Sequence, residues 1–231
     1  MRDFVLFIFF FLMISCKPQD YINMMDVGKE LGCSGNIGYY RTEEKNFINN
    51  TKVRYLELRL DCPNLFEVFD SITLRKVAAY RLYQKLNEKD RKDYKAIRVV
   101  IKNEKLSSND TSNLLSMSYL KNIYNSELIV HQYLEALKNG KKEYLRKAFD
   151  SDVFGISDKK VDSINNSFSE FTKGMLNESK LYNWAFVEDN HKKYRLLVFL
   201  TNAKGNFNKK FQFALHDSLK AEKNIVSIKF Q

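Results

Sequence analysis

Histidine and carboxylate side chains that could act together are scarce in this sequence. His131 and Glu135 are four residues apart, so on a helix they would share a face and could work as a general acid–base pair. The same spacing is common on helix surfaces and in helix cores that catalyse nothing. The sequence therefore offers this pair only as a weak catalytic candidate.

The remaining acids and histidines match no catalytic or metal-binding motif. His191 is expected in a turn and His216 near a strand end, and no His-Glu-x-x-His spacing occurs. Asp150 and Asp152 flank Ser151 and could bind a cation, although acidic loops are usually solvated. Glycine-rich phosphate loops and the Gly-x-Ser-x-Gly elbow are also absent from the sequence. These features predict a protein that is not an enzyme and that holds no metal or cofactor.

The N-terminal residues carry a different chemistry, which is covalent attachment to a membrane. The apolar run from Phe4 to Ile14 would span roughly 16 Å as a helix, about half of a hydrocarbon core of about 30 Å. That length is typical of the apolar region of a signal peptide. The run leads into Ser15-Cys16, and a small residue directly before a cysteine resembles the bacterial lipobox. The resemblance implies that residues 1–15 are a lipoprotein signal peptide and that Cys16 is acylated; an ordinary secretory signal is the alternative.

A lipoprotein of this kind would be anchored in the lipid bilayer of the bacterial cell envelope. Each buried methylene group contributes about 0.8 kcal/mol, so three acyl chains on Cys16 would make attachment effectively permanent. Residues 16–50 are expected to form a polar tether and an irregular segment. Lys17 rather than aspartate follows Cys16. In the sorting rule of enteric bacteria, an aspartate at this position signals retention in the inner membrane. By resemblance to that rule, Lys17 does not signal such retention, and the sequence does not specify which membrane holds the protein.

The other two cysteines are candidates for a disulfide bond. Cys33 and Cys62 form an even pair in a chain expected to be exported to an oxidising compartment. A bond between them would close a loop of about 29 residues and add roughly 3 kcal/mol of stability. The alternative is two small buried thiols that never meet.

Composition excludes several classes of protein. The chain has 231 residues, 44% of them hydrophobic, which is enough to bury a core and excludes a disordered chain. A mean hydropathy of -0.43 excludes a polytopic membrane protein. The net charge of +10 comes from lysines and arginines that are spread along the sequence rather than grouped in blocks. It indicates either attraction to anionic headgroups or simply a solvated surface, and no nucleic-acid partner is expected.

A small domain of the βαβ type is expected over residues 51–105. Val53–Asp61 alternates between apolar and polar residues, which predicts a half-buried strand. Apolar residues from Phe66 to Leu86 recur at helical spacing, and Asn87–Asp93 is expected to be a charged turn. A second strand follows around Ile97–Ile101. The segment after it, Leu106–Asn113, is the best linker candidate.

Residues 118–231 are expected to form an α+β domain, with helices packed on a four-stranded antiparallel sheet. Its first clear helix is predicted over Glu127–Asn139, with Leu128, Ile129, Tyr133, Leu134 and Leu137 on its buried face. Two further helical patterns follow. The predicted strands are Leu181–Val187, Tyr194–Thr201, Phe211–Leu215 and Ile225–Phe230.

This C-terminal half resembles the nuclear-transport-factor-like superfamily, whose curved sheet wraps around helices to form a cone. The residues that carry the likeness are the opening helix Val130–Lys141 and the last strand, Ile225–Phe230. Enzymes of that superfamily use aspartate and histidine inside the cone, which implies the same place for His131. A cystatin-like sheet on a helix is the nearest alternative fold.

Three aromatic residues are candidate lining for a pocket in this domain. Tyr182, Trp184 and Phe186 alternate along one strand and are expected to share a face, either around a ligand or within a filled core. Together these features favour a non-catalytic binding or assembly module of the envelope, with an envelope protein or a second copy as possible partner. The alternative is an isomerase- or hydrolase-like enzyme that uses the cone.

Overall fold

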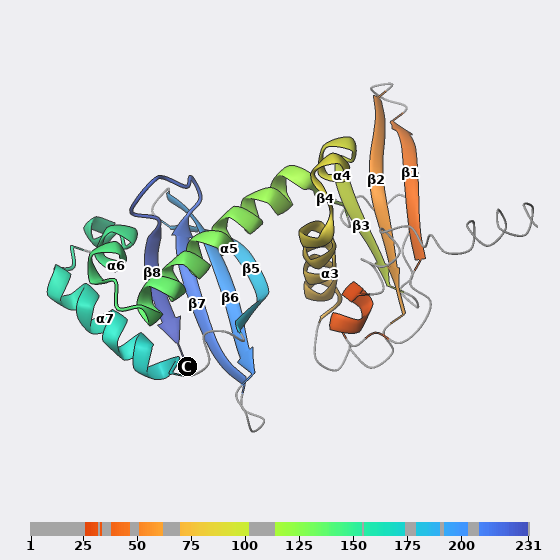
Figure 1. The fold of residues 1–231 in the computed structure, drawn as a ribbon. Helices are drawn as coiled ribbons and strands as arrows, with labels where there is room; N and C mark the ends of the chain where they lie inside the picture. The colour runs from red at the N-terminus through yellow and green to blue at the C-terminus, as the bar shows by residue number, and fades with distance from the viewer. Residues whose placement is uncertain are drawn as a thin grey trace, which may run out of the picture. The chain divides into compact units, whose positions relative to one another are not determined.

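The computed structural model describes residues 26–31, 33, 38–46, 51–61, 70–101, 114–153, 155–173, 179–189, 192–202 and 208–230. They belong to two compact units, an N-terminal unit that ends at Lys121 and a C-terminal unit that begins at Asn122 (Figure 1). Each unit combines a four-stranded sheet with helices. The fold class is therefore α+β, as the sequence predicts.

A mixed sheet forms the centre of the N-terminal unit. Its strands lie in the order β1 (Gly38–Asn46), β2 (Thr51–Leu60), β3 (Ala96–Ile101) and β4 (Leu114–Ser116). β2 and β3 are parallel and are joined through the helix α3 (Ser71–Lys85), which confirms the predicted strand-helix-strand arrangement. The two outer strands run antiparallel to their neighbours. These outer strands are not among the predicted ones, and β1 lies in the segment expected to be irregular.

Two capping residues determine where the helices of this unit begin. Asp70 accepts hydrogen bonds from the backbone N–H and the hydroxyl of Thr73, at 2.8 and 2.7 Å, and so starts α3. The expected charged turn after α3 is instead the short helix α4 (Glu88–Asp93). It forms because the side-chain Oδ1 of Asn87 accepts a hydrogen bond of 2.9 Å from the N–H of Asp90. The prediction of a turn there is wrong.

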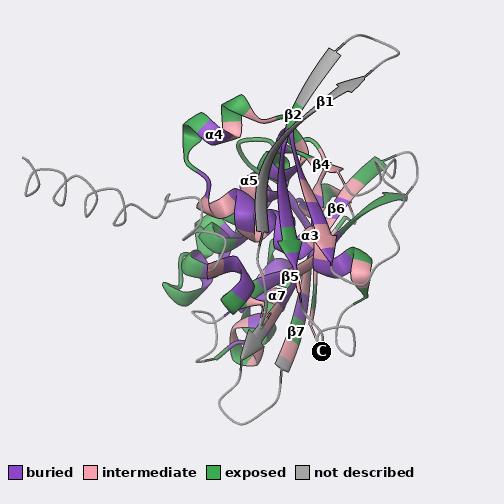
Figure 2. Cartoon of the chain, turned by 90° about the vertical axis from the view of Figure 1, so that its right-hand side faces the viewer, coloured by how far each residue is buried: buried purple, intermediate pink, exposed green. Residues whose placement is uncertain are grey.

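β2 is buried along much of its length (Figure 2). Leu56, Leu58 and Leu60 lie on one face, as the alternation predicts, but Tyr55 and Glu57 on the other face are also buried. The Glu57 carboxylate is paired with Arg59 at 2.7 Å and lies 3.7 Å from Arg98 on β3. A strand can bury a carboxylate when arginines from its own and the neighbouring strand pair with it. The prediction that this face of the strand is exposed is therefore wrong at Tyr55 and Glu57.

The long helix α5 (Met117–Lys138) begins ten residues before the predicted start at Glu127. The hydroxyl of Ser116 accepts a hydrogen bond of 3.1 Å from the N–H of Tyr119 and stabilises the first turn. The helix then buries a stripe of residues at a spacing of three and four: Leu120, Ile123, Ser126, Glu127, Val130, Tyr133, Leu134 and Leu137. Leu128 is 41% exposed, contrary to expectation, because it lies to one side of this stripe.

The rest of the C-terminal unit contains short helices followed by a meander. The helices are α6 (Lys142–Ala148), the 3-10 turn η3 (Ser151–Val153) and α7 (Asp158–Phe171). The strands are β5 (Ser179–Asp189), β6 (Lys192–Asn202), β7 (Asn208–His216) and β8 (Ile225–Phe230). Each strand is antiparallel to the next, which confirms the predicted four-stranded antiparallel sheet.

The helices of this unit pack on one face of the β5–β8 sheet. The ring of Tyr133 on α5 lies 5.7 Å from that of Phe213 on β7, and Phe168 on α7 lies 5.4 Å from Phe211. Phe168, Phe211 and Phe213 are all fully buried. α5 crosses this face of the sheet in Figure 1. We call the opposite side of the sheet the open face.

Candidate functional site

Of the cysteines singled out from the sequence, only Cys33 lies among the described residues. It takes part in a disulfide bond, and its N–H donates a hydrogen bond of 2.9 Å to the carbonyl of Gly28. Cys16 and Cys62 lie outside the described residues. Pairing of Cys33 with Cys62 and acylation of Cys16 therefore stay predictions.

His131 is paired with a different carboxylate from the one expected. Its Nε2 lies 3.7 Å from Oε1 of Glu127, one turn earlier on α5, whereas Glu135 is exposed. Glu127 is buried because it lies in the stripe that faces the sheet. The His131 side chain is 46% exposed, and its ring lies with its edge toward Phe199, at 6.2 Å. His131 is thus paired with Glu127 rather than with the weak candidate Glu135, and the pair lies at the edge of the core.

A register shift in β5 separates Tyr182 from the other two candidate aromatics. Between Leu181 and Asn183 the pairing with β6 slips by one residue, which places a bulge at Tyr182. Trp184 is 1% exposed and belongs to the filled core. Phe186 is 46% exposed at the end of the strand. Trp184 and Phe186, opposite Leu197 and Arg195, keep the predicted common face, whereas the shift at Tyr182 breaks the alternation before them.

The structure brings together two residues that the sequence analysis treated separately. Nε2 of His216, the last residue of β7, lies 2.8 Å from Oδ2 of Asp150, which follows α6. Both side chains are largely buried, with 14% and 10% of their surface exposed. The ring of Tyr194 lies 5.8 Å from the ring of His216. This arrangement can hold an imidazole in one orientation, which is what a general base or a structural tie requires.

Asp150 is held in place by the backbone around it. Its N–H donates a hydrogen bond of 2.7 Å to the carbonyl of Ile225, and Phe149 forms a parallel bridge with the same residue. The N–H of Asp152 reaches the other carboxylate oxygen at 3.3 Å. The two acids considered for a cation are paired instead with His216 and Lys223 respectively.

A hollow of about 300 Å³ lies on the open face beside this pair. We call it the open-face hollow. Its floor is apolar and comes from four strands and η3, through Val153, Val187, Tyr194, Leu196, Ala214 and Val226. Its polar lining consists of Lys192, Gln212, Ser227 and Lys229. The lining contains two cations and no acid, so the hollow is suited to an apolar group that carries a negative charge.

Arg195 lies on β6 and faces the helices, on the other side of the sheet from the open-face hollow. It is 3% exposed, and its guanidinium donates to the Asn122 carbonyl, the Ser126 hydroxyl and both the carbonyl and the carboxylate of Asp217, at 2.5–2.9 Å. It also lies over the ring of Phe186, at 5.4 Å. Its Nε is buried and has no acceptor among the described residues. These bonds join α5 to the first residues of β6, the strand that also carries Tyr194 and Leu196.

Among the described residues, no group of three or more histidine, cysteine or acidic side chains is placed to hold a metal ion. None of the described helices has both the length and the apolar character needed to cross a membrane. No family model matches the chain, and no curated protein or solved structure matches it either.

Proposed function

We propose that this chain is a lipoprotein of the bacterial cell envelope that is anchored through Cys16 and acts as a non-catalytic binding module. The anchor rests on the short apolar run Phe4–Ile14 followed by Ser15-Cys16. In this proposal the C-terminal unit binds a small amphiphilic anion in the open-face hollow. Such an anion has an apolar body and one negatively charged group.

The observation that carries the binding role is the one-sided cover of the β5–β8 sheet. α5 and α7 bury the face with Phe211 and Phe213, whereas Leu196, Tyr194 and Val187 on the open face stay partly exposed. A sheet face that needed only to be stable would carry polar residues where it meets water. Here apolar side chains form the floor of a hollow and lysines lie at its border.

The anchor is tested by metabolic labelling with a fatty-acid analogue. The wild-type chain should be labelled, and Cys16→Ala should not, because the thiol is the acceptor. Cys33→Ala is the matched control and should keep its label. Equal labelling of wild type and Cys16→Ala would refute the anchor.

The hollow is tested with naphthalene sulfonate, a water-soluble molecule with an apolar body and one negative charge. Saturation transfer from the full-length protein to the naphthalene protons should be strong for the wild type. It should be lost when Lys192 and Lys229 are both replaced by glutamate. Lys193→Glu is the control, because Lys193 is exposed on the same strand but does not line the hollow. Equal transfer in all three proteins would refute the assignment.

The His216–Asp150 pair favours a second candidate function, an isomerase- or hydrolase-like enzyme. A largely buried imidazole oriented by a carboxylate, next to a tyrosine that lines a hollow, is an arrangement that can move protons. Naphthyl ester hydrolysis tests this candidate. Turnover by the wild type that His216→Gln abolishes, with naphthalene sulfonate binding unchanged, would favour the enzyme. Absence of turnover would favour the binding module.

A further inference from the structure

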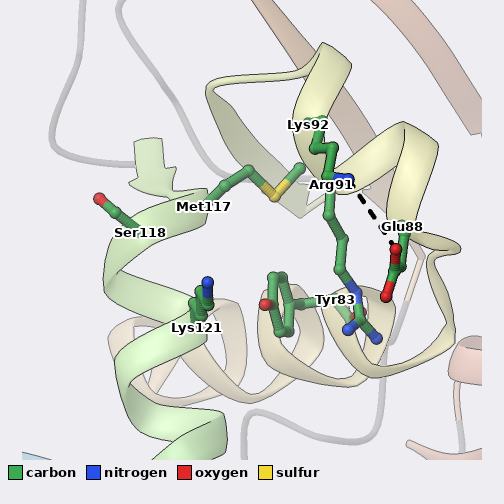
Figure 3. A pocket seen from close by; sticks show the side chains of 7 residues that line it. All are labelled: Tyr83, Glu88, Arg91, Lys92, Met117, Ser118 and Lys121. Carbon is green, nitrogen blue, oxygen red and sulfur yellow. Dashed lines mark hydrogen bonds and ion pairs between the residues drawn. The ribbon is translucent and has the colours of Figure 1, made fainter.

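A second pocket, of about 420 Å³, lies wholly within the N-terminal unit. We call it the α3–α4–α5 pocket after the helices that line it. α3 contributes Tyr83, α4 contributes Glu88, Arg91 and Lys92, and the first turns of α5 contribute Met117, Ser118 and Lys121. Figure 3 shows Lys121 and the α4 side chains on opposite sides of the Tyr83 ring.

The charges of the lining residues favour an anion. Three cations face one carboxylate, so the formal charge of the lining is +2, from three positive charges and one negative charge. The carboxylate of Glu88 is exposed, and its contact with Lys92 is long, at 3.9 Å. Such a surface pair contributes little and neutralises the pocket only weakly. No ion pair of Lys121 is found in the part of the chain that the structure describes.

Arg91 is positioned before any ligand arrives. Its Nε and Nη2 donate to the carbonyls of Tyr83 and Gln84, at 3.2 and 3.1 Å, at the end of α3. The guanidinium also lies over the Tyr83 ring, at 4.5 Å from its centre. A cation held in this way loses little conformational entropy when an anion binds beside it.

We propose that the α3–α4–α5 pocket binds a phosphomonoester. A phosphomonoester carries about two negative charges near neutral pH, which matches the charge of the lining. Arginine and lysine are the side chains that most often bind phosphate, and the Ser118 hydroxyl adds a donor at the border of the pocket. Tyr83 and Met117, both buried, offer an apolar wall to the organic part of the ester. The inference does not depend on the function proposed for the C-terminal unit.

The phosphate could belong to a soluble molecule or to a lipid, and one experiment distinguishes the two sources. The full-length protein is placed in nanodiscs of phosphatidylcholine, either with glycerol phosphate in solution or with phosphatidic acid in the bilayer. Hydrogen exchange is then measured for the amides of α4 and the first turns of α5. Slower exchange only with glycerol phosphate would support a soluble ligand, and slower exchange only with phosphatidic acid would support a lipid.

Two variants with the same change of charge make the proposal falsifiable. Lys121→Glu should abolish the slower exchange in whichever arm shows it. Lys89→Glu should not, because Lys89 is exposed on α4 but does not line the pocket. Unchanged exchange of the wild type in both arms would overturn the proposal. So would protection that survives in Lys121→Glu, or protection that is lost equally in both variants.

Discussion

The imidazole of His216 and the carboxylate of Asp150, 66 residues apart in the chain, meet at 2.8 Å beside the open-face hollow. The contact joins the end of β7 to the segment between α6 and η3. Both side chains are largely buried, so each gains a polar partner that water does not replace. The pair therefore supports Tyr194, which lines the hollow, whether or not it moves protons.

Removing either partner should destabilise the C-terminal unit. We expect Asp150→Asn and His216→Gln each to lower the free energy of unfolding by about 1–3 kcal/mol, because a buried polar group loses its partner. The double variant should lose less than the sum of the two losses. Urea unfolding of the four proteins measures this difference. Asp162→Asn, which breaks the more exposed pair with Arg146, should cost less; an equal cost would contradict the argument.

Asp70 should give α3 a stability that disappears in acid. Hydrogen bonds from the hydroxyl and the N–H of Thr73 hold the pKa of the Asp70 carboxyl below its ordinary value of 3.8. The stabilisation is thus present above pH 3.8 and is lost as the pH falls through the lower pKa of the folded state. Asp70→Ala should cost about 1 kcal/mol at neutral pH and less in acid.

Thermal unfolding at neutral and acidic pH compares Asp70→Ala with the wild type. Asp93→Ala, which removes an exposed carboxylate from α4, is the control and should change the melting temperature little at either pH. A cost of Asp70→Ala that stays constant into strong acid would show that the charge of the cap is not involved.

Tyr133 should make the C-terminal unit sensitive to alkali. Its ring is fully buried, its hydroxyl donates to the Asn165 side chain, and burial raises the pKa of this phenol above its ordinary value of 10.0. Above pH 10 the unfolded tyrosine ionises while the folded one resists, so stability falls as the pH rises.

Tyr133→Phe should lower the free energy of unfolding by about 1–3 kcal/mol at neutral pH, because Asn165 loses its donor. The same variant should flatten the decline of stability above pH 10. Urea unfolding at neutral and alkaline pH measures both effects. Tyr124→Phe alters a half-buried tyrosine on the same helix and should cost less at neutral pH. A wild-type slope in the alkaline range for Tyr133→Phe would refute the assignment.

Regular repeats of apolar residues were sufficient to predict most helices and strands. Each strand predicted for β6, β7 and β8 lies within the observed one. The start of α5 could not be found this way, because it depends on the Ser116 cap rather than on the apolar pattern. The bulge after Leu181 is likewise invisible in an alternating sequence, and it reassigns the faces of the residues around it.

The candidate site was harder to predict than the fold. The sequence places His216 near a strand end and Asp150 after a helix, and both placements are correct. Their contact depends on the bridge between Phe149 and Ile225, which brings the segment after α6 beside β8. No local pattern encodes such a long-range pairing. The hollow beside them needs four strands and η3 to be assembled before its lining exists.

The two leucines Leu128 and Leu134 on α5 provide a direct test of the buried stripe. Leu134 is 3% exposed and Leu128 is 41% exposed, although the sequence analysis places both on the buried face. Leu134→Asp should lower the free energy of unfolding of the C-terminal unit by more than about 3 kcal/mol, because it buries a charge without a partner. Leu128→Asp makes the same chemical change on the same helix and should cost less than about 1 kcal/mol.

Urea unfolding, followed through the buried Trp184, measures both variants in the unit concerned. The matched pair removes the effect of helix propensity, since each variant places one aspartate in the interior of α5. Leu134→Ala provides a folded comparison if Leu134→Asp fails to fold, and it should cost about 2–5 kcal/mol. Equal losses for Leu128→Asp and Leu134→Asp would mean that the exposed side of α5 is covered, and the assignment of the buried stripe would be wrong.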